Sequence, residues 1–195
     1  MGVRIMKAVI FNGAKEGDLT IKAIEATLLN QLTKYGWEVD PIELRNMQIA
    51  ACKGCFDCWI RTPGNCVIND YGRETTRKAI QSDLMVWLTP ITFGGYSPEL
   101  KSSLDRIIPI LLPYFESHHG QFHHKMRYKK YPKLLVIGVK GSDVGDEETF
   151  LALVERNTLN FRPPAYAAGV LHRNEDPKAI TTFVNEQLKK MGVNR

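Results

Sequence analysis

The stretch Lys7-Ala-Val-Ile-Phe-Asn-Gly13 sets the pattern that decides the fold of this 195-residue chain. A short apolar run closed by turn-forming residues is typical of a strand buried in a parallel sheet. Directly after it, apolar residues recur at spacings of three and four positions, as on one face of a helix: Ile21, Ile24, Leu28, Leu32 and Tyr35. Gly36 then ends the helical pattern. The chain therefore begins with a strand, a turn and a covering helix.

The same alternation of strand and helix repeats along the chain. Four further strands are predicted at residues 37–44, 84–88, 133–139 and 165–171. Helices are predicted between or after them at residues 70–80, 100–111, 149–157 and 180–191. Five strands that alternate with helices indicate a parallel sheet covered on both faces. The predicted fold class is α/β, a three-layer sandwich around a five-stranded parallel sheet, and a single domain accounts for residues 1–195.

The composition limits the classes of function. Hydrophobic residues make up 44% of the chain, which excludes a disordered protein. No apolar run approaches the ~20 residues that cross a bilayer, and the N-terminus lacks the apolar core of a signal peptide. We therefore expect a soluble, cytoplasmic protein that does not bind membranes. The chain has 26 basic and 21 acidic residues, a net charge of +5, which hints at an anionic partner.

The loop after the first strand runs from Asn12 to Thr20 and leads into the first helix. Glycines let backbone amides turn toward an anion, and a helix N-terminus adds partial positive charge. The dinucleotide and Walker patterns are both absent, which argues against a Rossmann dehydrogenase or a nucleotide-hydrolysing enzyme. A plain turn capped by Asp18 or Thr20 stays open beside phosphate binding. Glu16 and Asp18 make the loop less attractive to a phosphate.

The loop after the third strand combines two prolines, two glycines and two aromatic residues between Thr89 and Pro98. Aromatic rings stack on flat ligands, and backbone amides can bond the edge of a heterocycle. The segment therefore suggests a backbone shaped to approach a flat molecule. The alternative is a rigid turn before an amphipathic helix that carries an ion pair between Lys101 and Asp105.

All four cysteines lie within 15 residues of a long loop over 45–69, spaced C-x2-C-x2-C-x7-C: Cys52, Cys55, Cys58 and Cys66. Two consecutive C-x2-C steps let one tight loop present three thiolates to an iron–sulfur cubane, which a fourth cysteine can complete. All-cysteine zinc sites normally use two C-x2-C pairs a dozen or more residues apart. Disulfides are not expected in a cytosolic chain. The spacing favours an iron–sulfur cluster, while zinc and a redox dithiol pair stay open.

Three motifs together resemble the iron–sulfur flavoproteins, which belong to the NADPH-dependent FMN reductase group of flavodoxin-like proteins. They are the cysteine string that runs from Cys52 to Asp70, the turn from Thr89 to Gly95, and the helical Lys101-x-x-x-Asp105-Arg106. The resemblance implies a flavodoxin-like three-layer sandwich that binds FMN. The first loop departs from the family, because acidic residues stand where serine, arginine and asparagine are usual.

The resemblance assigns cofactor contacts position by position. The first loop would hold the FMN phosphate, through Asn12, Gly13, Ala14, Lys15 and Thr20. The turn after the third strand would line the isoalloxazine ring, mainly with its backbone, through Pro90, Ile91, Thr92, Phe93, Gly94 and Gly95. The end of the fourth strand would form the far side of the pocket, through Val139, Lys140, Gly141 and Ser142. A 4Fe–4S cluster beside the flavin would be held by Cys52, Cys55, Cys58 and Cys66.

These contacts imply an FMN-dependent oxidoreductase that passes electrons between a reduced donor, such as NAD(P)H, and a small-molecule or protein acceptor. FMN and the 4Fe–4S cluster would carry the electrons, and no catalytic side chain is expected, because the flavin supplies the chemistry. Two alternatives stay open: a cluster-free NAD(P)H-dependent flavin or quinone reductase, and a cysteine-metal binding or regulatory module. The resemblance also implies a homodimer or homotetramer.

Residues 117–131 are predicted to form an exposed loop or a subunit contact, with histidine pairs at 118–119 and 123–124. Between Ser117 and Lys133 there are five basic residues and no acidic one: Lys125, Arg127, Lys129, Lys130 and Lys133. Their five positive charges equal the net charge of +5. The rest of the chain therefore has 21 basic and 21 acidic residues and no net charge. One local patch argues against a nucleic-acid surface. It fits an acidic electron partner, a nicotinamide phosphate or a neighbouring subunit.

Overall fold

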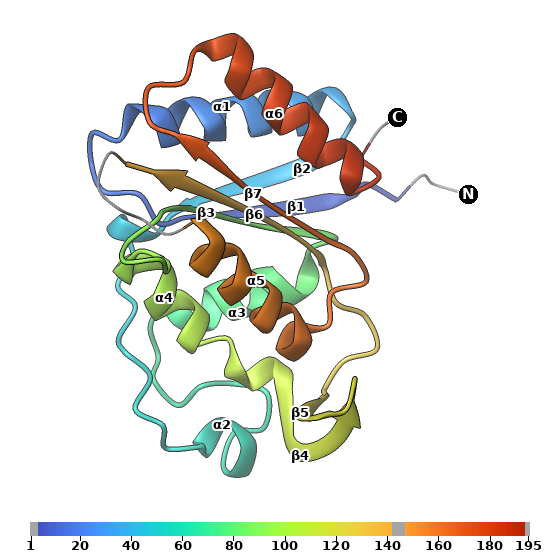
Figure 1. The fold of residues 1–195 in the computed structure, drawn as a ribbon. Helices are drawn as coiled ribbons and strands as arrows, with labels where there is room; N and C mark the ends of the chain where they lie inside the picture. The colour runs from blue at the N-terminus through green and yellow to red at the C-terminus, as the bar shows by residue number, and fades with distance from the viewer. Residues whose placement is uncertain (1–3, 142–146, 194–195) are drawn as a thin grey trace.

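The computed structural model describes residues 4–141 and 147–193, in which a central sheet separates two layers of helices (Figure 1). The five strands pair in parallel in the order β2-β1-β3-β6-β7. Their bounds are β1 Lys7–Asn12, β2 Glu38–Glu43, β3 Leu84–Pro90, β6 Lys133–Lys140 and β7 Tyr166–His172. This is the strand order of flavodoxin-like proteins. The predicted fold class is confirmed, and each predicted strand lies within two residues of an observed one.

Helices cover both faces of the sheet, two on one side and three on the other (Figure 1). The first face carries α1 (Leu19–Lys34) and α6 (Pro177–Lys190), and the second carries α3 (Tyr71–Gln81), α4 (Pro98–Asp105) and α5 (Glu147–Phe161). Successive strand residues point to opposite faces. In β1, Ile10 therefore joins the core under α1 and α6, while Phe11 joins the core under α3, α4 and α5.

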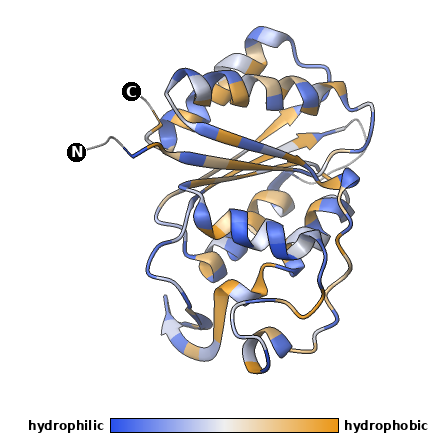
Figure 2. Cartoon of the chain, turned by 180° about the vertical axis from the view of Figure 1, so that it is seen from behind, coloured by the Kyte–Doolittle hydropathy of each residue, from blue (hydrophilic) through white to orange (hydrophobic). Residues whose placement is uncertain are grey.

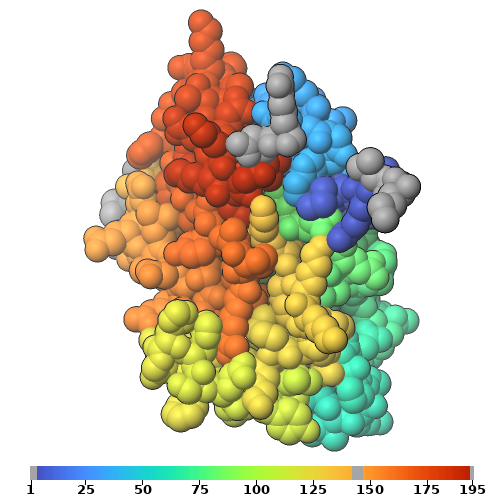
Figure 3. All heavy atoms as spheres, turned by 90° about the vertical axis from the view of Figure 1, so that its right-hand side faces the viewer, coloured from blue at the N-terminus to red at the C-terminus, as the bar shows by residue number. Residues whose placement is uncertain are grey.

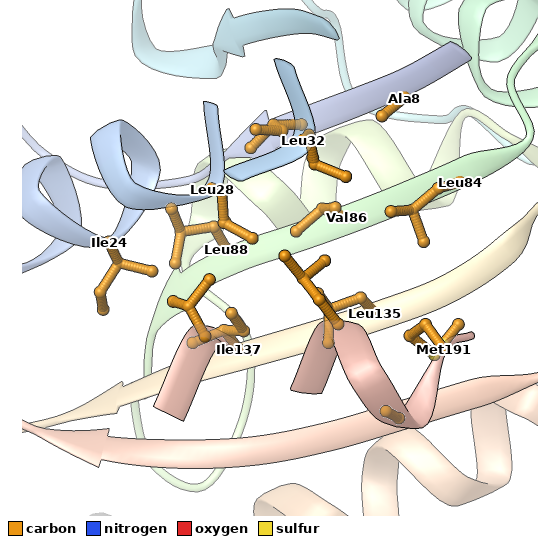
Figure 4. Packing of buried hydrophobic residues seen from close by; sticks show 14 of the residues in the cluster. Ala8, Ile24, Leu28, Leu32, Leu84, Val86, Leu88, Leu135, Ile137 and Met191 are labelled. Atoms are coloured by element: carbon orange, nitrogen blue, oxygen red, sulfur yellow. The ribbon is translucent and has the colours of Figure 1, made fainter. Parts of the chain in front are cut away.

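The packing under α1 explains why the helical spacing of the first predicted helix is a reliable signal. Leu28 and Leu32 of α1 lie over Leu84, Val86 and Leu88 of β3, and all five side chains are fully buried (Figure 4). Residues four apart on a helix share a face, and residues two apart on a strand share a face. Both periodicities can be read from the sequence, and the helix face and strand face that they predict pack against each other in the structure.

Helix α4 is shorter than predicted. The apolar spacing extends the helix to Leu111, but α4 ends at Asp105 and a 3-10 turn follows at Ile108–Ile110. Pro109 contributes to the difference, because a proline has no N–H to donate to the carbonyl of Asp105, four positions before it. Ile107 and Leu111 are nevertheless buried in the core under α3, α4 and α5. Figure 2 shows this hydrophobic segment leading away from the helices.

The prediction of a loop over 117–131 is wrong, because most of this region belongs to an antiparallel hairpin. Its strands are β4 (Leu111–His118) and β5 (Gln121–Met126). They are joined by a two-residue turn in which His119 has φ +49° and Gly120 has φ +73°. Two left-handed residues in a row are typical of the tight turns that connect antiparallel strands. One histidine pair therefore opens the turn, and the other lies on a strand.

The cysteine loop and the hairpin lie side by side at one end of the molecule (Figure 3). The loop contains a short helix, α2 (Asp57–Ile60). Trp59 of α2 donates a hydrogen bond from Nε1 to the Leu111 carbonyl at 2.9 Å, and its ring lies 4.8 Å from that of His124. Both segments are additions on the face of the sheet that carries α3, α4 and α5.

No helix in the described ranges combines the length and the apolar character needed to cross a membrane.

Candidate functional site

Three of the predicted cofactor loops leave neighbouring strands at the carboxyl edge of the sheet. The chain moves outward from β1 to β2 on one side and from β3 to β6 on the other, so strand order reverses between β1 and β3. Ligands of open α/β sheets bind at this point. The loops are joined by their backbones, since Gly13 N donates to Leu88 O at 2.8 Å and Ile91 N donates to Val139 O at 2.9 Å.

Gly13 lies directly against the start of α4. A Cβ atom on Gly13 would lie 2.8 Å from Leu100 Cβ and closer still to Ser97 Oγ. Real Cβ atoms do not approach other atoms this closely, so the first loop can only pack here with glycine at this position. Ser97 in turn begins α4, because its Oγ accepts from Leu100 N at 3.3 Å and its own N–H donates to Thr89 Oγ1 at 2.9 Å.

The first loop is shaped by Asn12, which is buried. Its Oδ1 accepts from Ala14 N at 2.8 Å. Glu25 of α1 lies next to it, and burial raises the pKa of that carboxyl even though a hydrogen bond with Asn12 acts in the opposite direction. The backbone amides of Lys15, Glu16 and Gly17 donate no hydrogen bond within the described chain. These amides stay available to an anion.

The sequence offers two residues, Asp18 and Thr20, as the N-terminal cap of α1. Asp18 is the cap, since its carboxylate accepts from Ile21 N at 3.1 Å. Arg173, in the loop after β7, neutralises this carboxylate with an ion pair of 3.0 Å. Thr20 Oγ1 accepts instead from Asn174 N at 3.3 Å. The acidic residue that made the loop less attractive to a phosphate therefore has its own counter-charge.

The turn after β3 holds its aromatic side chain out in solvent. Thr92 and Gly95 exchange two backbone hydrogen bonds of 3.0 and 2.9 Å, and between them Phe93 has φ +49° and Gly94 has φ +72°. Phe93 is fully exposed, at 101% relative accessibility. Left-handed backbone at a bulky residue is a strained conformation that concentrates at binding sites. Phe93 thus stands exposed at the tip of a tight turn at the carboxyl edge of the sheet.

Tyr96, the other aromatic residue of this loop, points inward. Its ring packs edge-on against Trp87 at 5.7 Å and Phe150 at 5.8 Å, and its hydroxyl oxygen accepts from Asn157 Nδ2 at 2.8 Å. Burial raises the pKa of Tyr96 to about 12. The side chain is therefore a neutral support beneath the turn and does not serve as an acid or base at neutral pH.

The end of β6 completes this edge. Val139 is buried, Lys140 and Gly141 are half-buried, and the Lys140 carbonyl accepts from Arg173 N at 2.9 Å. Ser142, the last residue assigned by resemblance to this side, lies outside the described residues. The structure thus brings the starts of all three predicted flavin loops together at the ends of β1, β3 and β6.

The four cysteines line one pocket, together with Lys53, Phe56, Ile68, Arg106, Ile108 and Pro109. All four are free thiols, and Cys58 is the most buried. Burial raises the pKa of the Cys58 thiol, and the neighbouring Cys66, Cys52 and Cys55 raise it further. In residues 4–141 and 147–193, no three His, Cys, Asp or Glu side chains form a group arranged to hold a metal ion.

The backbone of the cysteine loop suits an anion. Gly54 has φ +63° and Phe56 has φ +58°, and the amides of residues 52–56 donate to no acceptor in the described ranges. Consecutive free amides in such alternating turns form the concavities that bind phosphates and iron–sulfur clusters. A cubane takes its thiolates at separate corners, which a loop that surrounds a pocket can supply. The four thiols that line the pocket and the free amides of the loop are the groups that bind a 4Fe–4S cluster, although the thiols are not drawn together closely enough here to hold a metal ion.

The two predicted sites lie at opposite ends of α4. Ser97 begins the helix at the carboxyl edge of the sheet, and Arg106 ends it at the cysteine pocket. No residue that lines the cysteine pocket belongs to the predicted flavin loops. Eight helical residues span about 12 Å. The cysteine pocket is thus separated from the flavin loops by the length of this helix and does not directly adjoin them.

The basic patch is mainly structural. Lys130 pairs with the buried Asp83, Lys133 Nζ donates to Met191 O at 2.7 Å, and Arg127 Nε donates to Pro109 O at 2.8 Å. Only Lys125 and Lys129 of the five are exposed without a partner among the described residues. The His118 ring lies 4.2 Å from that of His119 and 6.2 Å from that of His123, whose Nδ1 bonds Asn160 Oδ1 at 3.0 Å, but these histidines form no metal-holding group among the described residues. Of the five basic residues that were expected to face an anionic partner, only these two lysines are left for that role.

Residues 6–170 match the family described as NADPH-dependent FMN reductase. An iron–sulfur flavoprotein of Methanocaldococcus jannaschii is 33% identical over 107 residues, covering 54% of this chain and 53% of the relative. One from Archaeoglobus fulgidus is 30% identical over 106 residues, covering 53% and 46%. The chain spans about half the length of the curated relatives it matches.

Solved structures agree on the fold. An NAD(P)H:quinone oxidoreductase from Methanothermobacter marburgensis superposes with a TM-score of 0.67 at 13% identity, covering 94% of this chain and 97% of that one. An FMN-dependent NADH-azoreductase from Bacillus anthracis, solved in complex with FMN, gives a TM-score of 0.66 at 13% identity, covering 97% and 98%. Because the family match extends over most of the sequence and the strand order agrees with it, the chain belongs to the NADPH-dependent FMN reductase family.

Proposed function

We propose that this chain is an oxidoreductase that binds FMN where strand order reverses and passes electrons between a reduced donor, such as NAD(P)H, and an acceptor. The observation that carries the proposal is that the three predicted flavin loops leave the neighbouring strands β1, β3 and β6 where strand order reverses, with Phe93 exposed on the middle loop, in a chain that belongs to this family. Bound FMN would supply hydride acceptance and stepwise electron release, while the protein positions it.

The first loop is the proposed phosphate site. Free amides at residues 15–17 and the side chain of Lys15 would face the phosphate, and Thr20 would hold the loop to the strand-end segment after β7. The pairing of Asp18 with Arg173 supports this assignment, because it removes the repulsion that an unpaired carboxylate would exert. Asn12 and Gly13 would set the shape of the loop.

The turn from Pro90 to Gly95 is the proposed ring site. Its backbone and the Phe93 ring would contact one side of the isoalloxazine, and residues 139–141 would contact the other. The chain need only exclude water and fix the orientation of the ring here. The tightly held Tyr96 supports a role of this kind, since it stiffens the turn from below.

The cysteine pocket is the proposed site of a 4Fe–4S cluster, held by Cys52, Cys55, Cys58 and Cys66. Such a cluster exchanges single electrons, and its potential depends on charge and hydrogen bonds around it. Support comes from the free amides of residues 52–56 and from the names of the relatives. Separation from the flavin by about the length of α4 would let the two cofactors be assembled independently. Free thiols fit a reducing compartment, so we propose a cytoplasmic location.

Cofactor analysis of protein purified without oxygen tests the proposal. We expect a yellow-brown preparation with one FMN and four iron and four sulfide per chain. A plain yellow preparation that bleaches on addition of NADPH would favour the cluster-free flavin or quinone reductase. A colourless, zinc-loaded preparation that does not bind added FMN would support the regulatory module instead. Light scattering on the same sample would test the proposed homodimer or homotetramer.

A further inference from the structure

Arg106 joins the two ends of the cysteine loop. It follows the last turn of α4, and its side chain is completely buried. Its Nη1 donates to Ala50 O at 2.7 Å, two residues before the first cysteine, and its Nη2 donates to Ile68 O at 3.2 Å, two residues after the last. Asp70 accepts from both nitrogens at 2.8 Å. One guanidinium therefore closes the loop at its base.

The surroundings of Arg106 are built to keep it there. A Cβ atom on Gly72 would lie 2.9 Å from Arg106 Cζ, so the guanidinium needs a glycine in the first turn of α3. Asp70 begins α3 by accepting from Gly72 N at 3.0 Å and also accepts from Ala50 N at 2.8 Å. Burial alone would raise the pKa of Asp70, but its bonds to Arg106 and to these amides hold that pKa below its usual range.

One donor of this guanidinium is left over. The Nε atom of Arg106 is buried and makes no hydrogen bond to any described residue, although four bonds satisfy the two Nη atoms. A buried charged donor without a partner costs free energy, so such atoms call for an explanation. Arg106 lines the pocket of the four cysteines, beside Ile68, Ile108 and Pro109. Cys66 lines the same pocket.

We propose that Arg106 is a positioning residue for the cysteine pocket, where it clamps the ends of the cysteine loop and keeps its Nε–H as a donor to sulfur at the occupied site. The inference rests on the proposed function, since the sulfur is that of the cluster or of its cysteine ligands. A hydrogen-bond donor and a positive charge favour the more negative, reduced state of a cluster. Arg106 would thereby raise the reduction potential of the site.

Two substitutions distinguish the hydrogen-bonding geometry of the Arg106 side chain from its charge. Arg106→Lys keeps the charge but loses the planar fork and Nε, and Arg106→Gln also removes the charge. Arg73→Lys is the matched control, because Arg73 also bonds the cysteine loop, through Cys66 O at 2.6 Å and Val67 O at 3.1 Å, but all three of its guanidinium nitrogens have partners. Each variant is prepared without oxygen and analysed for FMN, iron, sulfide and midpoint potential, with amide hydrogen exchange over residues 50–70.

In both Arg106 variants we expect the midpoint potential of the cluster to fall. We also expect exchange of the hydrogen-bonded amides of residues 50–70, such as those of Ala50, Gly64 and Asn65, to accelerate about tenfold or more, the factor that one lost charge-assisted hydrogen bond represents. Arg73→Lys should accelerate exchange near Cys66 and leave the potential unchanged. An unchanged potential in iron-loaded Arg106→Gln, or an equal fall in Arg73→Lys, would overturn the donor role.

Hydrogen exchange on FMN-loaded protein tests separately whether Arg106 holds the two ends of the cysteine loop together. If wild-type protein prepared without oxygen binds FMN but neither iron nor sulfide, the cluster assignment fails and the donor role fails with it. Slow wild-type exchange that accelerates in Arg106→Lys would still establish the clamp. Exchange that does not change in either Arg106 variant would overturn it.

Discussion

Gly13 and Ser97 are in contact across the reversal of strand order, where a side chain on the first would collide with the hydroxyl that caps α4. The first cofactor loop and the helix after the third strand therefore form one rigid surface.

Gly13→Ala should separate the first loop from α4. We expect the free energy of unfolding to fall by about 1–3 kcal/mol, as for other overpacked sites, and FMN affinity to fall with it. Urea denaturation and fluorescence titration with FMN measure the two effects. Gly95→Ala is the control for stability, since nothing lies within 3.5 Å of the added Cβ. A Gly13→Ala protein as stable as wild type would contradict the tight contact.

Phe93→Ala should weaken FMN binding without weakening the fold. The ring is fully exposed, so its loss should change the free energy of unfolding by less than about 0.5 kcal/mol. Loss of an aromatic stacking contact should raise the Kd for FMN about tenfold. Phe122→Ala, which removes another exposed ring, on β5, is the control and should bind FMN normally. Equal FMN affinity in both variants would remove Phe93 from the site.

Cys55→Ser should abolish incorporation of iron and leave FMN bound, because the thiol lies at the other end of α4 from the flavin loops. Iron analysis and flavin absorbance on the same oxygen-protected sample measure both. Loss of FMN as well, with an intact circular dichroism spectrum, would show that the two sites are not independent.

Glu25→Gln should stabilise the protein at neutral pH. The folded-state pKa of Glu25 is raised, mainly by burial, so the folded protein binds more protons than the unfolded chain between pH 4.5 and the folded pKa. Wild-type stability therefore falls as pH rises through this window. Gln removes that loss and can still accept from Asn12. Urea midpoints measured from pH 4 to pH 8 should converge at low pH and diverge above it, and parallel curves would contradict the shift.

Lys130→Met should destabilise the protein by about 1 kcal/mol, because it removes one partner of the buried Asp83 carboxylate. Arg4 and the Lys7 amide remain bonded to Asp83 and limit the loss. Lys129→Met, which changes an exposed neighbour, should leave stability unchanged. In NAD(P)H oxidation assays Lys129→Met should raise KM in a salt-sensitive way if this lysine faces an anionic partner, whereas unchanged kinetics would leave it without that role.

The strands and helices could be predicted because each shows a single periodicity that its packing then uses, as Leu28 and Leu32 do over β3. The predicted ion pair between Lys101 and Asp105 is present at 2.6 Å. The limit of α4 could not be read from spacing alone, because Ile107 and Leu111 keep the helical interval although Pro109 interrupts the helix. The signal for the hairpin was His119-Gly120, which is easily missed in a histidine-rich stretch.

The three flavin loops could be predicted as neighbours, because the carboxyl ends of parallel strands meet at one edge. The distance from these loops to the cysteine pocket could not, since it depends on the path of a long loop that bears no periodic pattern. The role of Arg106 was hidden for the same reason. Its partners Ala50, Ile68 and Asp70 lie 36 to 56 residues away in sequence and come together only in the folded chain.

The contact between Trp59 and the Leu111 carbonyl bears on how this protein evolved. The cysteine segment and the β4–β5 hairpin interrupt two different crossovers of the sheet, and each covers part of the other. An ancestor that carried only one of the two insertions would expose the aromatic side chains with which that insertion contacts the other. Descendants are therefore expected to keep both insertions or neither, and a graft onto a plain flavodoxin-like scaffold should transfer the pair together.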